Sequence, residues 1–281
     1  MTSTNDLIAS FRQLHHAGMP LLLPNIWDPL SAALVQATGL PAVATSSSAM
    51  ALSNGYRDGQ KLPFEDLLKI LRRITTTVQV PVSADIERGY AEDDATLAGH
   101  IQQLIGTGII GINYEDSLPG AAEMVPMEQQ VKSIAAIRKA ADAEGQKLFI
   151  NARVDVYIKG GALGDDGKLK EAIRRGKAYK DAGADGLYPI LLKDPVHMET
   201  LVQEVGLPLN ITMVPGIPDL AVLKAIGVAR VSLASGFLRH TAFSMLALVE
   251  RLLQGTVWAE TMRAAVPSEQ MNKLIPDGPA Q

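Results

Sequence analysis

The chain has 281 residues, of which 47% are hydrophobic and 20% charged, and its formal net charge is −4. This composition supports a substantial buried core, and the lack of a basic stretch interleaved with aromatic residues argues against nucleic acid as a partner. The chain contains no cysteine, which excludes disulfides, thiolate metal sites and a cysteine nucleophile or acid.

The chain begins with MTSTNDLIASFRQLHHAG, which lacks a basic segment followed by a long apolar run. We therefore expect no signal peptide. No stretch of about 18 apolar residues is present, so we also expect no membrane span. These observations predict a soluble cytoplasmic protein.

Eight short apolar runs follow, separated by amphipathic stretches. Their lengths and their β-branched residues are typical of buried parallel strands. The runs lie at 21–25, 42–46, 81–85, 110–115, 147–153, 186–190, 208–213 and 229–234. The stretches between them predict helices; Leu97, Ile101 and Leu104, for example, fall on one helical face.

The residues that precede these apolar runs alternate between two kinds along the chain. The even-numbered runs are entered through glycine, and three of the four odd-numbered runs are entered through an X-Pro pair. Such alternation is typical of a closed eight-stranded barrel with layered interior packing. We therefore predict that residues 1–281 form a single (β/α)₈ TIM-barrel domain. An open doubly wound sheet is less favoured, because no G-x-G-x-x-G follows any run.

Residues 236–281 extend beyond the eighth run. Within them, 236–266 predict two further helical stretches that are rich in leucine, methionine and alanine and exceed what one barrel needs. These helices either pack on the barrel wall or form an oligomer contact, and the sequence leaves both interpretations open.

Charged residues follow several of the predicted strands, at the end where barrels of this class carry their chemistry. Asp85 and Glu87 follow the third run, Glu115 the fourth and Arg153 the fifth, while Asp58 lies in a polar loop. Any one of them would be an ordinary cap or turn residue. Together they bring several carboxylates and one fixed cation to the same mouth of the barrel.

Clustered carboxylates are tolerated when a cation lies between them. His15 and His16 are adjacent and would point in different directions on a helix, so no histidine pair suggests zinc. All-oxygen ligation favours Mg²⁺ or Mn²⁺. The alternative is a ring of salt bridges with Arg88 and Arg153.

A run of serines, Ser46, Ser47 and Ser48, follows the second run and offers hydroxyl and backbone N–H donors beside that cluster. Such donors suit a carboxylate or an oxyanion. The alternative interpretation is a tightly turning loop.

With these residues identified, the chain resembles the isocitrate lyase and phosphoenolpyruvate mutase superfamily over most of its length. PVSADIERGY (81–90) is similar to the family motif P-V-x-A-D-x-D-x-G-[FY], with Glu87 in place of the second Asp. GINYEDS (111–117) resembles I-E-D-[KS], and NARVD (151–155) resembles [IN]-A-R-T-D. The resemblance implies a (β/α)₈ barrel with bound Mg²⁺, in which a helix beyond the barrel is often exchanged between subunits. It also implies a homodimer or homotetramer.

The resemblance further implies substrates that are small 2-oxo or 2-hydroxy carboxylates and react through an enolpyruvate-like species. On the matching motifs, Asp85 would bind the metal most directly, and Asp58, Glu87 and Glu115 would hold its waters. The implied catalytic residues are Arg153, Ser46 and Glu115.

The resemblance also implies which residues would contact the substrate. Ser46, Ser47 and Ser48 align with the loop that receives the substrate carboxylate and enolate oxygen. Arg153 would pair with a charged substrate group. The remaining two candidates match positions that bind a second carboxylate in the lyases, namely Asn210 and Thr212.

The sequence departs from the family pattern in one loop. The lyases carry K-[KR]-C-G-H after the fourth strand, whereas the segment here is EDSLPGAAEMVPMEQQ (115–130), without Cys, Lys, His or Asn. This departure argues against authentic isocitrate or methylisocitrate lyase and leaves the general acid or base unassigned. Tyr90, Tyr114 and Tyr188 are possible donors, although packing roles are favoured for each.

Three functional hypotheses follow. The first is a Mg²⁺-dependent lyase-type enzyme that performs C–C bond cleavage, decarboxylation or hydrolysis. The second is a phosphonopyruvate-type mutase or a related P–C bond enzyme, in which Arg57, Arg88 or Lys159 would assist Arg153. The third is a 2-oxo acid binding protein that kept the metal site and lost the catalytic loop.

Overall fold

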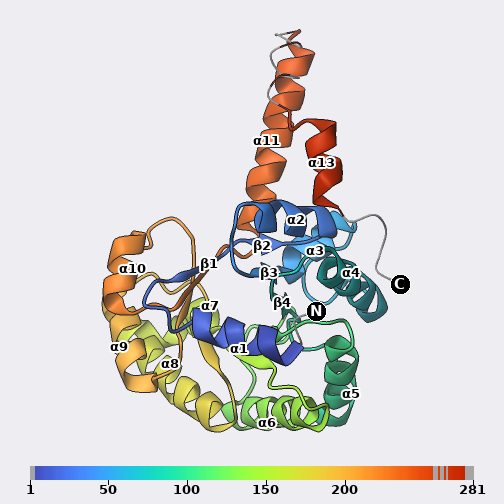
Figure 1. Ribbon diagram of the computed structural model, residues 1–281. Coiled ribbons are helices and arrows are strands. Elements are labelled where there is room, and N and C mark those ends of the chain that lie inside the picture. Colours follow the sequence, from blue (N-terminus) through green and yellow to red (C-terminus); the bar gives the residue numbers. More distant parts are fainter. Residues whose placement is uncertain (1–3, 256–258, 260–262, 264, 276–281) are drawn as a thin grey trace.

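Short parallel strands form the centre of the molecule and helices surround them (Figure 1). The computed structural model describes residues 4–255, 259, 263 and 265–275. The strands are β1 (Leu21–Leu23), β2 (Asn25–Ile26), β3 (Val43–Thr45), β4 (Val82–Asp85), β5 (Gly111–Glu115), β6 (Phe149–Val154), β7 (Gly186–Pro189), β8 (Asn210–Thr212) and β9 (Arg230–Ser232). They coincide with the eight predicted apolar runs.

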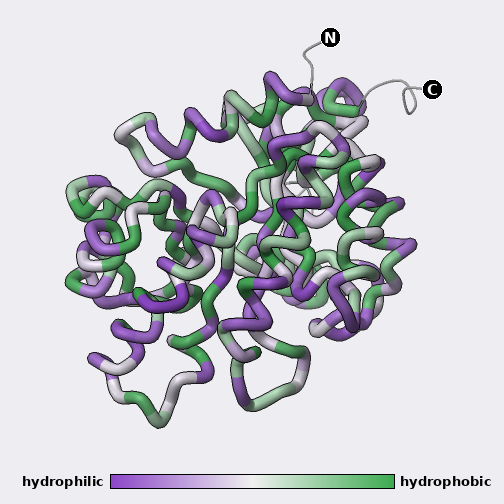
Figure 2. The backbone as a smooth tube through the Cα atoms, turned by 90° about the horizontal axis from the view of Figure 1, so that it is seen from below, coloured by the Kyte–Doolittle hydropathy of each residue, from purple (hydrophilic) through white to green (hydrophobic). Residues whose placement is uncertain are grey.

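The helices alternate with these strands along the chain. They are α1 (Thr4–Leu14), α2 (Pro29–Ala37), α3 (Ser47–Ser53), α4 (Phe64–Thr77), α5 (Asp94–Ile105), α6 (Met127–Ala143), α7 (Val156–Lys159), α8 (Gly164–Asp181), α9 (Pro195–Val205), α10 (Leu220–Ile226), α11 (Gly236–Leu253) and α13 (Ser268–Leu274). Hydrophilic and hydrophobic residues alternate along the outer helices, as in amphipathic helices that pack on a barrel (Figure 2).

The nine strand segments make eight barrel strands because Pro24 divides the first one. Proline has no backbone N–H, so the hydrogen-bonding ladder is interrupted there. β1 pairs in parallel with β9, and β2 pairs with β3. A single parallel bridge between Leu187 and Leu209 connects β7 to β8. These pairings close the ring and confirm the predicted TIM-barrel fold.

Helix α1 covers the N-terminal end of the barrel, which the sequence analysis did not foresee. Helix α1 lies across the barrel in Figure 1. In Figure 2, the side of the molecule that carries the N-terminal segment is opposite the side from which long loops project. Ile8 and Phe11 pack with Leu23 and Phe149 in a buried cluster of their own. The base is therefore sealed, and access to the barrel interior is left to the C-terminal end.

Helix α11 projects away from the barrel, with α13 beside it (Figure 1). Phe243, Leu246 and Leu253 on α11 are 69%, 65% and 83% exposed. The second helical stretch predicted in the tail falls largely on residues 256–266, most of which lie outside the described residues. None of the helices that the structure describes is long and apolar enough to cross a lipid bilayer.

His15 is buried at the sealed base. Its ring stacks on Phe149 with centroids 4.4 Å apart, and its Nδ1 lies 2.8 Å from the Phe11 carbonyl oxygen. Burial, followed by the nearby charge of Arg230, lowers the pKa of His15 from 6.5 to about 3. The folded protein therefore holds this imidazole neutral at pH values where the unfolded chain protonates it.

This difference predicts a loss of stability in mild acid. The contribution of His15 is fully present above pH 6.5, its ordinary pKa, and is lost as the pH falls from there toward 3. Between pH 7.5 and pH 5 it should reduce the free energy of unfolding by about 2 kcal/mol. In urea titrations, His15→Leu should remove this part of the pH dependence, whereas substitution of the exposed neighbour, His16→Gln, should leave it unchanged. An equal pH dependence in wild type and His15→Leu would contradict the prediction.

Candidate active site

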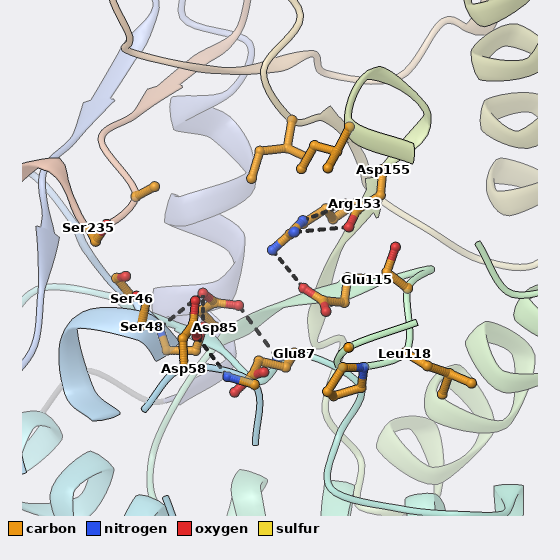
Figure 3. Close-up of a pocket in the computed structure, with 18 of the residues that line it drawn as sticks. Ser46, Ser48, Asp58, Asp85, Glu87, Glu115, Leu118, Arg153, Asp155 and Ser235 are labelled. Carbon is orange, nitrogen blue, oxygen red and sulfur yellow. Dashed lines mark hydrogen bonds and ion pairs between the residues drawn. The ribbon is translucent and has the colours of Figure 1, made fainter. Parts of the chain in front are cut away.

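A cavity of about 420 Å³ lies at the C-terminal ends of the strands. It is open to solvent and is bordered by groups from the segments after β3, β4, β5 and β6 (Figure 3). The predicted site residues that line it are Ser46, Ser47, Ser48, Asp58, Asp85, Glu87, Glu115 and Arg153. Most of the predicted set is thus brought together in one place.

The serine run fixes Asp85 at the end of β4. Ser46 is the N-cap of α3, and its hydroxyl oxygen accepts a hydrogen bond from Ala49 N at 3.3 Å. The next residue donates twice to one carboxylate oxygen, because Ser47 N and Ser47 Oγ lie 3.0 and 2.7 Å from Asp85 Oδ2. Asp85 Oδ1 accepts a long 3.5 Å contact from Glu87 N, and Asp85 lines the cavity (Figure 3).

A tight turn after β4 places Glu87 beside Asp85. Glu87 has a φ of +50°, a conformation that costs a non-glycine residue about 1 to 2 kcal/mol. Gly89 permits the turn to continue, since a Cβ there would lie 2.4 Å from Leu97 Cδ1. Gln60 N donates to Glu87 Oε1 at 3.0 Å and holds the carboxylate near the cavity.

The adjacent strands β5 and β6 supply a buried ion-pair chain. Arg153 Nη1 lies 2.6 Å from Glu115 Oε2, and Arg153 Nε lies 2.7 Å from Asp155 Oδ1. Asp155 N donates to Asp116 Oδ1 at 2.9 Å, and Asp116 Oδ2 accepts from Arg175 Nη1 at 3.0 Å. The guanidinium of Arg153 is therefore held in one orientation by two carboxylates that are themselves anchored.

Burial and crowding disfavour a negative charge on two of these acids. Burial, then the charge of Asp85, raises the pKa of Glu87 to about 7. Burial raises the pKa of Glu115 to about 8, although the contact with Arg153 opposes this shift. A cation bound beside these acids would favour the ionised form of both.

The donor set fits a divalent cation that keeps part of its water shell. Asp58, Asp85, Glu87 and Glu115 offer oxygen ligands, which Mg²⁺ and Mn²⁺ prefer. Among the residues that the structure describes, no three His, Cys, Asp or Glu side chains converge closely enough to bind a metal together. Ser117 lines the cavity, and its Oγ is buried without a hydrogen-bond partner. These observations fit one direct carboxylate ligand, with water-mediated contacts from the rest.

The structure places the two remaining predicted residues away from this cavity. Asn210 is 1% exposed, and its Oδ1 accepts from Ser232 Oγ at 3.0 Å. Thr212 Oγ1 lies 2.8 Å from the Tyr188 hydroxyl and borders a neighbouring cavity of about 450 Å³. The two cavities share Ile190, Ala234 and Ser235. Substrate binding by Asn210 and Thr212 stays a prediction.

Several lining residues were missed or given no defined role by the sequence analysis. Ser117, Leu118 and Gly120 belong to the segment after β5 and border the cavity, and Asp155 orients Arg153. Lys159 also lines it from the end of α7. The sequence signal for Asp155 was its spacing of two from Arg153, and Lys159 was named only as a possible aid to Arg153 in P–C bond chemistry. Ser117 becomes visible only when separate segments are assembled.

Comparison with known proteins agrees with this geometry. Residues 11–253 match the phosphoenolpyruvate phosphomutase family. An uncharacterized protein of Mycobacterium tuberculosis strain CDC 1551 / Oshkosh is 35% identical over 226 residues, covering 80% of this chain and 82% of that protein. The crystal structure of a candidate phosphonomutase from Burkholderia cenocepacia J2315 has a TM-score of 0.84 and 39% identity, covering 88% of this chain and 100% of that chain.

A further solved structure is phosphonopyruvate hydrolase in complex with oxalate and Mg²⁺. It has a TM-score of 0.82 and 25% identity, covering 95% of this chain and 94% of that chain. The protein described here belongs to the phosphoenolpyruvate phosphomutase family, within a superfamily of lyases and mutases. The predicted superfamily membership is confirmed.

The contact between Ser47 and Asp85 generates a prediction about metal affinity. Residues that orient a metal ligand typically change affinity by about 10- to 100-fold when they are removed, so Ser47→Ala should weaken Mn²⁺ binding by that amount. Ser48→Ala is the matched control, because Asp85 Oδ2 receives its two bonds from Ser47. Binding can be followed by electron paramagnetic resonance of free Mn²⁺. Equal affinities of the two variants would show that Ser47 does not orient a ligand.

Proposed function

We propose that this chain is a Mg²⁺- or Mn²⁺-dependent enzyme acting on a small 2-oxo or 2-hydroxy carboxylate through an enolpyruvate-like species. The overall reaction would be C–C bond cleavage, decarboxylation or hydrolysis. The observation that carries the proposal is the group of acids around one cavity, in which Asp85 is held in place by Ser47 and two neighbours have raised pKa values. The oxalate and Mg²⁺ bound by phosphonopyruvate hydrolase support it, since oxalate mimics a pyruvate enolate.

Each group has a role that follows from its contacts. Asp85 would hold the cation, and Asp58, Glu87 and Glu115 would accept hydrogen bonds from its waters. When bound, the cation supplies stabilisation for negative charge on a substrate oxygen. The hydroxyls of Ser46 and Ser48 border the same cavity and can donate to a substrate carboxylate.

Arg153 is suited to fix a substrate carboxylate. Its contacts with Glu115 and Asp155 use one hydrogen on each of Nε, Nη1 and Nη2, which leaves one hydrogen on each terminal nitrogen. The same contacts argue against P–C bond chemistry as the main activity. A phosphoryl group carries more negative charge than a carboxylate, and Glu115 and Asp155 already neutralise this guanidinium.

Oxalate binding tests the proposal. In calorimetric titrations, we expect oxalate to bind in the presence of Mg²⁺ and to bind far more weakly without it. Asp85→Ala should lower the affinity by about 100-fold or more, because it removes the expected direct ligand. Asp66→Ala is the matched control, since Asp66 pairs with Lys69 on the outer helix α4 and its loss should leave Mg²⁺-dependent binding unchanged.

The outcomes separate the competing functions. Mg²⁺-dependent binding together with turnover of 2-oxo or 2-hydroxy acids would support the proposed enzyme, and ³¹P NMR would detect any P–C bond product. Tight binding without turnover of any acid would favour a binding protein. If oxalate fails to bind under every condition, the acid cluster is structural and the proposal fails.

We also propose that the protein is a homodimer or homotetramer that uses α11. Phe243, Leu246 and Leu253 recur at helical spacing and give the projecting helix one apolar face. Light scattering coupled to size exclusion should show an oligomer for the wild type, and Phe243→Glu with Leu246→Glu should shift it toward monomer. Ser244→Glu adds a charge to the same exposed helix and should not do so. A monomeric wild type would refute the proposal.

A further inference from the structure

Acidic side chains outnumber basic ones around the active-site cavity. Its acids are Asp58, Asp85, Glu87, Glu115 and Asp155. Among the described residues, the cationic side chains that border it are Arg153 and Lys159. The two cations differ in what they contact, and this difference points to a role for the lysine.

Arg153 forms ion pairs with two neighbouring carboxylates. It contacts Glu115 and Asp155 at 2.6 and 2.7 Å, and these carboxylates raise the pKa of its guanidinium against the opposing effect of burial. An arginine in such a site does not release a proton. It can orient a substrate but cannot deliver hydrogen to one.

Lys159 is the last residue of α7, the short helix that follows β6. Its Nζ donates a hydrogen bond to the backbone carbonyl of Ala121, in the segment between β5 and α6. Within the described part of the chain, no carboxylate lies within ion-pair distance of this ammonium. Lys159 is therefore a cation at the cavity whose hydrogen-bond partner is a neutral backbone carbonyl, and this hydrogen bond can be broken.

The three tyrosines that the sequence analysis named as possible proton donors are excluded by their positions. Tyr188 is 4% exposed with its hydroxyl against Thr212, and Tyr114 is 1% exposed beneath the guanidinium of Arg88. Burial and the neighbouring Glu87 and Asp85 raise the pKa of the Tyr90 hydroxyl. None of these three tyrosines borders the cavity as the structure describes it. The lining serines are poor acids in water.

We propose that Lys159 is a catalytic residue that carries a proton between solvent and the carbon next to the substrate carbonyl. This inference rests on the proposed function and assigns its missing general acid and base. In one direction, neutral Lys159 removes a proton from C3 of a 2-oxo acid, and the C–H electron pair becomes the C2=C3 bond as the carbonyl oxygen takes the negative charge. In the other, the ammonium returns one proton to C3 and the carbonyl re-forms.

The bond from Lys159 to Ala121 allows a purely structural alternative, in which the lysine only holds the segment after β5 over the cavity. Arginine separates the two roles. Arginine keeps the charge and a donor for the Ala121 carbonyl, but its very high pKa prevents it from acting as a general acid or base near neutral pH. Lys159→Arg should therefore preserve ligand binding and lose proton transfer, whereas a structural role would leave both intact.

The test measures hydrogen–deuterium exchange of the pyruvate methyl group in D₂O by ¹H NMR, with Mg²⁺ present. The same preparations are titrated with oxalate by calorimetry, which does not require proton transfer. We expect the wild type to catalyse exchange, and Lys159→Arg and Lys159→Met to reduce it by about 100-fold or more. Lys168→Arg is the matched control, since Lys168 pairs with Asp165 on the outer helix α8.

Oxalate binding keeps this inference distinct from the proposed function. If the wild type does not bind oxalate, the proposed function fails. If the wild type binds oxalate but does not exchange pyruvate, or if Lys159→Arg exchanges it at the wild-type rate, Lys159 is not the proton carrier. Loss of exchange in Lys159→Arg with unchanged oxalate affinity supports the inference.

Discussion

Repulsion between carboxylates at the C-terminal mouth is the constraint on which the site depends. Asp85 and Glu87 come from one strand end, and Glu115 comes from the next. Burial raises the pKa values of both glutamates into the neutral range, although the contact between Glu115 and Arg153 opposes the shift of Glu115. The surrounding contacts serve mainly to hold the acids in position, and this is the arrangement expected of a site completed by a cation.

The barrel makes such a concentration of charge possible. Its parallel strands bring their carboxyl ends together, so acids far apart in sequence meet at one rim. α1 closes the opposite end with an apolar cluster around Phe11 and Phe149, which confines access to the mouth. A series of contacts then connects α8 to the cavity and holds Arg153 in place. It runs from Arg175 on α8 through Asp116 and Asp155 to Arg153. Burying these ions is tolerated because each one has an opposite partner.

Local patterns were sufficient to predict the strands and the acidic residues, because both leave a signal in short stretches. Apolar runs gave the strand positions, and residues such as Asp85 stand at predictable distances from them. What the sequence could not reveal depends on long-range assembly. α1 has an ordinary amphipathic pattern that does not identify its partner. The neutral acceptor of Lys159 is a backbone carbonyl, which has no side-chain signature, and the burial of Asn210 depends on how β8 and β9 pack.

The pairing of β1 with β9 has a consequence for how the protein is made. Leu21 pairs with Arg230 in β9, so the ring closes only after β9, the last of the strands that the structure describes, has left the ribosome. Until then the growing chain has unpaired strand edges at β1 and at its newest strand, and such edges are prone to intermolecular pairing. Contacts this distant in sequence also slow folding. A chain truncated before β9 would retain the acidic residues of the mouth but would be an open sheet, prone to aggregation.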